Sequence, residues 1–163
     1  MLGWVWRKTL GYVVEWGRSR IREGITISDF FVKTVGGSDP PGICLTLKIH
    51  NGGPVPVAPN EVFFNIFFGG VQGVQVHGKL KHLPEASAPE VLKRGQDGSL
   101  SVTMIPDWRF WMRKDTNAHL RNSCLVLQTS WGMVTVPVDR EASVVYSDSA
   151  LAHVERLKAF LKS

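Results

Sequence analysis

The chain has 163 residues and a mass of 18.1 kDa, which suits one domain with a single core. Hydrophobic residues make up 44% of it and charged residues 20%, a balance that excludes wholesale disorder. The net charge is +5, but residues 1–23 carry +3 of it, residues 148–163 carry +1, and the middle keeps only +1. This distribution argues against a nucleic-acid platform, which should gather its basic residues on the folded body.

The two cysteines and the N-terminal region indicate in which cellular compartment the protein is expected. Cys44 and Cys124 fall in different expected strands, and nothing resembles a Cys-x-x-Cys motif or a zinc spacing. The simpler interpretation is two reduced thiols in an intracellular protein, with a disulfide left open. Arg7, Lys8 and Glu15 interrupt every apolar run near the N-terminus, so no signal-peptide pattern forms. No stretch approaches the ~20 apolar residues that cross a bilayer, and we expect a cytoplasmic protein.

Residues 1–23 predict an amphipathic helix. At 100° per residue one broad arc collects the apolar side chains of Leu2, Val5, Trp6, Leu10, Tyr12, Val13 and Trp16. Tryptophan beside arginine and lysine is typical of a peripheral helix in a membrane interface. The same helix could instead cover its own β domain or contact a partner subunit. The residues expected to touch a membrane or a partner are Trp4, Trp6, Arg7, Lys8, Trp16 and Arg18.

From Ile25 the hydrophobic period changes to two, which indicates strands. A first strand or bent pair of strands ends at a turn-rich segment whose Pro40 and Pro41 cannot lie inside a central strand. Further strands are expected at residues 43–50, 61–68, 74–80, 100–104, 124–129 and 133–138, with a short one at 144–146. Ser147 and Asp148 can cap a final helix. The predicted organisation is a helix at 1–23, a β domain at 24–146 and a helix at 147–163.

Residues 107–123 interrupt the strand pattern with a short helix or an ordered loop. A candidate binding cluster lies there, because aromatic rings beside cations can stack bases or lie at a lipid interface. Its members are Trp108, Arg109, Trp111, Arg113 and Lys114. The alternative is that the aromatic residues form a hydrophobic plug at one end of the β domain.

Motifs for catalysis are missing from the sequence. It has no phosphate-binding, dinucleotide-binding, zinc-protease or serine-hydrolase signature, and the glycine-rich residues 67–78 predict a hairpin. His50, His77 and His82 could meet at a metal site, but solvent-facing histidines on strands are the simpler interpretation. An enzyme with a dispersed site would need a deep pocket lined by His77, Lys79 and residues 108–111. We expect no enzyme, no cofactor, no metal and no small-molecule substrate.

The order of strands and turns resembles a known family. The strand LTLKIHN, the break NGGPVPV, the strand EVFFNIFF and the return VQVHGKL resemble the late embryogenesis abundant type 2 domain, also called the WHy domain. LKRGQDGSLSVTMIP is similar to its polar turn and alternating strand, and SCLVLQTSWGMVTVPVD to its closing strand, break and Val-Pro-Val ending. The resemblance covers residues 30–140. The Asn51-Gly52-Gly53-Pro54 break differs from the Asn-Pro-Asn sequence that is commoner in the family.

The resemblance implies a seven-stranded antiparallel β-sandwich, immunoglobulin-like or fibronectin III-like, without cofactor or active-site residues. That family is associated with desiccation and stress responses and is often tethered to a membrane near its N-terminus. We therefore expect a non-enzymatic sandwich that acts by surface binding or stress protection, at a membrane face. The alternative is a structural or assembly protein, such as a viral or phage component or an oligomeric scaffold, whose terminal helices contact other subunits. The expected partners are a protein or membrane surface, or further copies of the chain.

Overall fold

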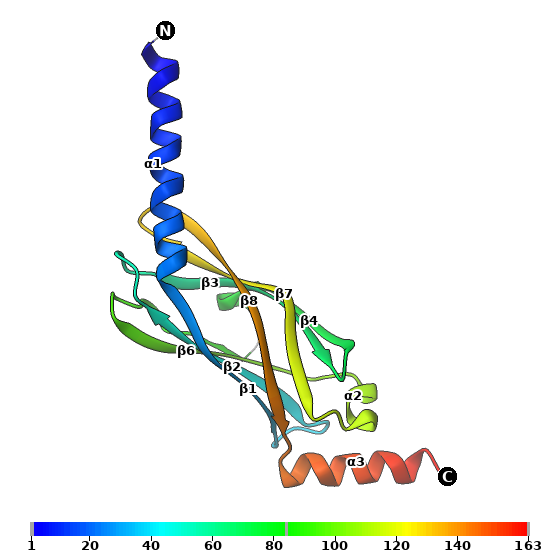
Figure 1. The fold of residues 1–163 in the computed structure, drawn as a ribbon. Coiled ribbons are helices and arrows are strands. Elements are labelled where there is room, and N and C mark those ends of the chain that lie inside the picture. Colours follow the sequence, from blue (N-terminus) through cyan, green and yellow to red (C-terminus); the bar gives the residue numbers. More distant parts are fainter. Residues whose placement is uncertain (1, 84, 163) are drawn as a thin grey trace.

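The computed structural model describes residues 2–83 and 85–162, with side chains from Thr9 onward. The fold is mainly β with a helix at each end of the chain, as the sequence predicts (Figure 1). The strands form one curled eight-stranded sheet, where the family resemblance implies seven strands. The helices are α1 (Leu2–Gly24), α2 (Trp108–Arg113) and α3 (Asp148–Phe160), and η1 (Leu80–His82) is a single 3₁₀ turn. The strands are β1 (Ile25–Val35), β2 (Gly42–Asn51), β3 (Ala58–Phe68), β4 (Val71–Lys79), β5 (Ala86–Ser87), β6 (Gln96–Met104), β7 (Asn117–Thr129) and β8 (Gly132–Val145).

The sheet is mixed rather than antiparallel throughout. Its strand order is β4-β3-β7-β8-β1-β2-β6-β5, and the neighbours are antiparallel except for β1 and β8. These two run parallel, with Val32 opposite Val144 and Lys33 opposite Val145. The expectation of an antiparallel sheet is therefore wrong at this pair. Apolar alternation tells which residues face a core, but it does not tell in which direction a neighbouring strand runs.

β7 begins at Asn117, inside the stretch expected to be a loop or short helix. Two exposed residues in succession, Arg121 and Asn122, interrupt the alternation of this strand. Asn122 has a φ of 48°, and the register with β8 shifts across these residues, which are the marks of a β-bulge. The bulge hides the period of two, so the alternation predicts the strand only from Cys124.

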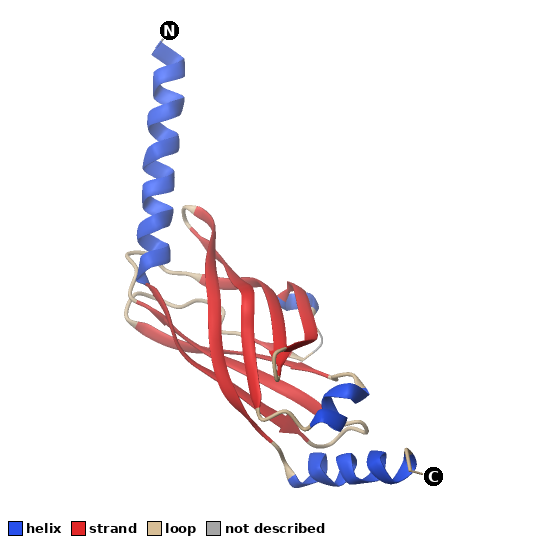
Figure 2. Cartoon of the chain, turned by 45° about the vertical axis from the view of Figure 1, so that its right-hand side comes forward, coloured by secondary structure: helices blue, strands red, loops and turns tan. Residues whose placement is uncertain are grey.

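The curled sheet surrounds one hydrophobic core (Figure 2). Side chains that are at most 2% exposed enter it from both halves of the sheet: Ile43, Leu45, Leu47 and Ile49 from β2, and Val62, Phe64, Ile66 and Phe68 from β3. The period of two expected along residues 43–50 is present. Along residues 61–68 buried residues alternate with half-buried ones, so only one face of this strand is fully covered. Cys44 is buried and Cys124 is partly exposed, and neither is in a disulfide.

The short helix α2 closes one end of the core. Asp107 caps it by accepting a hydrogen bond from the backbone N–H of Arg109. Phe110 and Trp111 are 3% and 1% exposed, and the Phe110 ring lies 4.5 Å from Phe68 and 4.9 Å from Trp111, between ring centroids. These two residues are the hydrophobic plug that the sequence offered as the alternative to a binding cluster.

Tyr146 packs beside this plug. Its ring is stacked on that of Phe110, with centroids 6.1 Å apart, and its hydroxyl donates to the carbonyl oxygen of Asp115 at 2.7 Å. Burial, and then the negative charge of Asp115, raises the pKa of Tyr146 to about 12. The phenol therefore stays protonated in the folded protein to a higher pH than in an unfolded chain.

The two tryptophans of α2 should differ sharply in their effect on stability. Trp111→Ala should lower the free energy of unfolding by about 3–5 kcal/mol, because it empties a packed position in the core. Trp108→Ala, at a residue 57% exposed, should change it by less than about 0.5 kcal/mol. Urea unfolding followed by circular dichroism measures both. Equal losses in the two variants would contradict the separation of α2 into a buried and an exposed tryptophan.

Tyr146 should make stability fall at alkaline pH. Its contribution is fully present below about pH 10, where the unfolded phenol is still protonated, and is lost as the pH rises toward the folded pKa. Tyr146 is the only tyrosine left after Tyr12→Phe, so the tyrosinate absorbance of that variant reports on it alone. We expect a midpoint near pH 12 in the folded protein. In urea the midpoint should be near pH 10. The same midpoint in both conditions would show that the phenol is not buried.

Candidate functional site

The helix α1 stands away from the sheet over most of its length (Figure 1). The apolar side chains of Leu10, Tyr12, Val13 and Trp16 are 58%, 76%, 47% and 63% exposed. Burial begins only in the last turns, where Ile21 is 1% exposed. The described part of the helix therefore leaves its apolar arc uncovered, and the alternative in which the helix covers its own β domain holds only for its last two turns.

The residues predicted to touch a membrane or a partner have different positions. Trp16 is exposed on the apolar arc, as predicted. Arg18 turns inward, because its Nε donates to the carbonyl oxygen of Trp131 at 3.1 Å. The side chains of the other four, Trp4, Trp6, Arg7 and Lys8, lie outside the described residues.

The last turns of α1 are fixed by close contacts through glycine. A Cβ atom on Gly17 would come within 2.5 Å of the Trp131 ring, and one on Gly24 within 2.5 Å of the Gly53 Cα. The backbone N–H of Gly52 donates to the carbonyl oxygen of Gly24 at 2.8 Å. Side chains at either position would separate the helix from the turns that hold it, so these contacts set the direction in which α1 leaves the sheet.

The turn that receives the helix is held by a buried amide. Asn51 is 0% exposed, and its Nδ2 donates to the carbonyl oxygens of Val55 and Leu92 at 3.0 and 2.8 Å. Its Oδ1 accepts from the backbone N–H of Gly53 at 3.0 Å. Each polar atom of this side chain has a partner, which a buried amide needs. The Asn-Gly-Gly-Pro sequence thus combines an anchoring amide with two glycines that allow α1 to approach.

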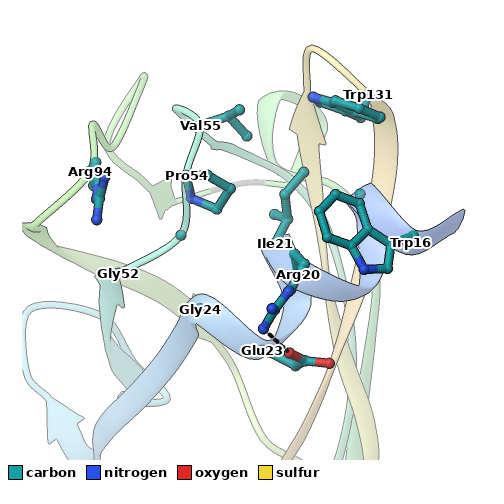
Figure 3. Close-up of a pocket in the computed structure, with 12 residues that line it drawn as sticks. Trp16, Arg20, Ile21, Glu23, Gly24, Gly52, Pro54, Val55, Arg94 and Trp131 are labelled. Carbon is teal, nitrogen blue, oxygen red and sulfur yellow. Dashed lines mark ion pairs between the residues drawn. The ribbon is translucent and has the colours of Figure 1, made fainter. Parts of the chain in front are cut away.

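A pocket with a volume of about 570 Å³ lies at this junction, and we call it the root pocket (Figure 3). It is bounded by the end of α1, the β2–β3 turn, the β7–β8 turn and the loop before β6. Its twelve lining residues are Trp16, Gly17, Arg20, Ile21, Glu23, Gly24, Gly52, Gly53, Pro54, Val55, Arg94 and Trp131. The walls are largely aromatic and aliphatic, and the charged groups are two guanidiniums and one carboxylate.

Three residues of the root pocket escape prediction from the sequence. Arg20 lies one turn after Trp16, with its guanidinium carbon 5.8 Å from the centre of the indole ring, and this spacing was a signal that could have revealed it. Trp131 and Arg94 lie in turns that are seventy or more residues beyond the end of α1 at Gly24. Only the folded arrangement of those turns brings the two residues to the helix, so no local sequence pattern predicts them.

The predicted cluster at residues 108–114 is not one binding surface. Trp111 lies in the core, and Arg113 pairs with Asp115 through Nε and Oδ2 at 3.1 Å. Trp108 and Arg109 remain on the surface, with the guanidinium 5.8 Å from the indole centre. The fifth member, Lys114, ends α2 in the left-handed conformation.

The histidines do not form a metal site. His50 on β2 pairs with Asp97 at 2.8 Å, and His77 on β4 pairs with Glu61 at 3.1 Å. The two rings thus pair with different carboxylates, one on β6 and one on β3. Within residues 2–83 and 85–162, no three histidine, cysteine or carboxylate side chains are grouped as metal ligands would be.

Comparison with known proteins adds information on the fold alone. No family model matches the chain, and no curated protein matches it either. A crystal structure described as the ApaA protein from Bordetella pertussis is 18% identical, with a TM-score of 0.49, over 76% of this chain and 94% of that one. The X-ray structure of a structural genomics target, SoR45, is 9% identical, with a TM-score of 0.50, over 77% and 89% of the two chains. The second likeness indicates a shared fold.

None of the helices in the described residues has both the length and the apolar character needed to cross a membrane.

Two glycines of α1 should respond oppositely to the same substitution. Gly17→Ala places a methyl group against the Trp131 ring, and we expect a loss of about 1–3 kcal/mol in the free energy of unfolding. Gly11→Ala is the matched control: a Cβ there meets nothing within 4 Å, and alanine favours helix by up to about 1 kcal/mol. Urea unfolding measures both. A Gly17→Ala variant as stable as Gly11→Ala would show that α1 does not pack against Trp131.

Proposed function

We propose that this chain is a non-enzymatic β-sandwich module, of the kind that its sequence resembles in late embryogenesis abundant type 2 domains, held against an anionic membrane surface by α1. The observation that carries the proposal is the uncovered apolar arc of α1 on a helix that projects from the sheet. In this arrangement the β domain presents its surface next to the membrane, where it acts by binding or protection.

The chemistry of α1 suits an interface. Tyr12 and Trp16 combine an apolar ring with a polar group, which favours the boundary between headgroups and acyl chains. Burying a large apolar side chain contributes about 1.5–3 kcal/mol, and each cation near an anionic surface about 1 kcal/mol. Residues 1–23 hold five cations against two carboxylates. Together these contributions suffice for reversible peripheral binding without a membrane-spanning segment.

The sandwich part of the proposal is supported by the curled sheet. Its two halves both send side chains into one core, and the parallel β1–β8 pair joins the halves along one side. A sandwich of two sheets packs in this manner when one pair of edges is joined. The fold likeness to SoR45 is compatible with it, and the resemblance to the WHy domain supplies the suggested surface role.

A second candidate function is assembly through the terminal helices. The observation in its favour is that α3 also ends in exposed apolar side chains, with Phe160 and Leu161 76% and 57% exposed. Both ends of the chain thus present apolar helix surface that another copy could cover. Light scattering separates the two candidates, because assembly requires self-association in the absence of lipid.

Vesicle binding tests the membrane proposal. The variant Leu10→Ser/Val13→Ser/Trp16→Ser should bind vesicles containing about 30% phosphatidylserine at least about tenfold more weakly than the parent, because it removes three apolar contacts. Glu15→Ser/Arg22→Ser is the matched control, since it alters exposed residues outside the apolar arc and leaves the net charge unchanged. Co-sedimentation measures the bound fraction.

Binding by the parent should also weaken at about 0.5 M salt, which screens the attraction to anionic lipid. Equal sedimentation of the parent and the triple variant would overturn the membrane role of α1. Self-association of the parent in the absence of lipid, lost in the triple variant, would instead favour assembly.

A further inference from the structure

We propose that the root pocket binds the phosphate-bearing headgroup of an anionic phospholipid, with the glycerol and the first acyl carbons against its apolar walls. This inference rests on the proposed membrane function and gives it a lipid-specific contact. It follows from the position of the pocket beside the apolar arc of α1, from the charges on its rim and from the apolar character of its walls.

The pocket lies on the same side of α1 as the uncovered apolar arc. At 100° per residue, Leu10 and Val13 fall within about 140° of the helix circumference together with five of the six pocket residues that α1 supplies, which are Trp16, Gly17, Arg20, Ile21 and Gly24. Trp16 belongs to both surfaces. A helix that lies on a bilayer through this arc therefore places the pocket next to the headgroup layer.

The rim of the pocket favours an anion. Arg94 forms no ion pair or hydrogen bond with the residues that the structure describes. Arg20 pairs with Glu23 at 3.6 Å, but both side chains are more than 60% exposed, and such surface pairs exchange partners easily. One cationic charge is left in excess. A guanidinium suits this ligand, because its planar fork can bind two phosphate oxygens at once.

The walls favour a lipid over a free phosphate ion. The backbone N–H groups of Gly52 and Gly53 already donate to Gly24 and Asn51, so they are not available to cradle a small anion. The other lining residues include Ile21, Pro54, Val55 and the two tryptophans, which offer contact to carbon rather than to oxygen. The volume of about 570 Å³ is within the range of small-molecule sites.

The test uses the full chain and a soluble lipid, so that it does not depend on vesicle binding. Dihexanoyl phosphatidylglycerol, kept below its micelle concentration, is titrated into the labelled protein and followed by NMR at Gly53, at Arg94 Nε and at Trp131 Nε1. We expect saturable shifts at these groups. Arg94→Gln should weaken binding about tenfold or more. Lys93→Gln, which removes the same charge from the adjacent residue outside the pocket, should leave the affinity unchanged.

The outcomes separate this inference from the proposed function. Saturable binding that depends on Arg94 supports the site even if vesicles do not bind, and in that case only the membrane role of α1 fails. If dihexanoyl phosphatidylcholine causes the same chemical-shift changes with the same affinity, selectivity for an anionic headgroup is overturned. Equal binding of inorganic phosphate would overturn the lipid assignment. No shift, or shifts that Arg94→Gln and Lys93→Gln weaken equally, would overturn the site itself.

Discussion

The close approach of Gly24 to Gly53 is the contact on which the functional part of this molecule depends. β1 starts at the residue that follows Gly24, so the contact fixes the end of the helix and the start of the sheet together. The hydrogen bond from the backbone N–H of Gly52 to the carbonyl oxygen of Gly24 also orients the end of the helix relative to the β2–β3 turn. α1 is about 35 Å long at 1.5 Å per residue, and only its last two turns are held. The apolar arc is left uncovered as a consequence of this geometry.

Asn51 connects that contact to the rest of the root pocket. Its side chain binds the β2–β3 turn and Leu92, and its backbone carbonyl oxygen accepts from Gly95 at 2.5 Å. The loop that carries Arg94 is therefore held by the same residue that shapes the glycine turn. A single buried amide thus positions two of the four segments around the pocket, and its polar atoms are too well paired to serve as ligand contacts themselves.

Local periodicity predicts much of this structure, and tertiary contacts explain what it misses. The buried alternation of β2 and the capped helix at Ser147 follow from side-chain order and short-range hydrogen bonding, so the sequence reveals them. The parallel β1–β8 pair depends on which strands meet, and the start of β7 is hidden by the bulge at Asn122. In the same way Trp16 was predictable from the helix period, whereas Arg94 is brought to the pocket by tertiary contacts of its loop, among them the hydrogen bonds of Asn51.

The two tryptophan-rich helices show why composition alone cannot distinguish a plug from a docking surface. α2 has six residues and lies between β6 and β7, so short links keep both of its ends at the sheet and Trp111 enters the core. α1 has 23 residues, and its contacts with the sheet are confined to the end next to β1. Both helices place arginine beside tryptophan. Helix length and the position of the attachment decide that Trp111 stabilises the fold while Trp16 stays available to an interface.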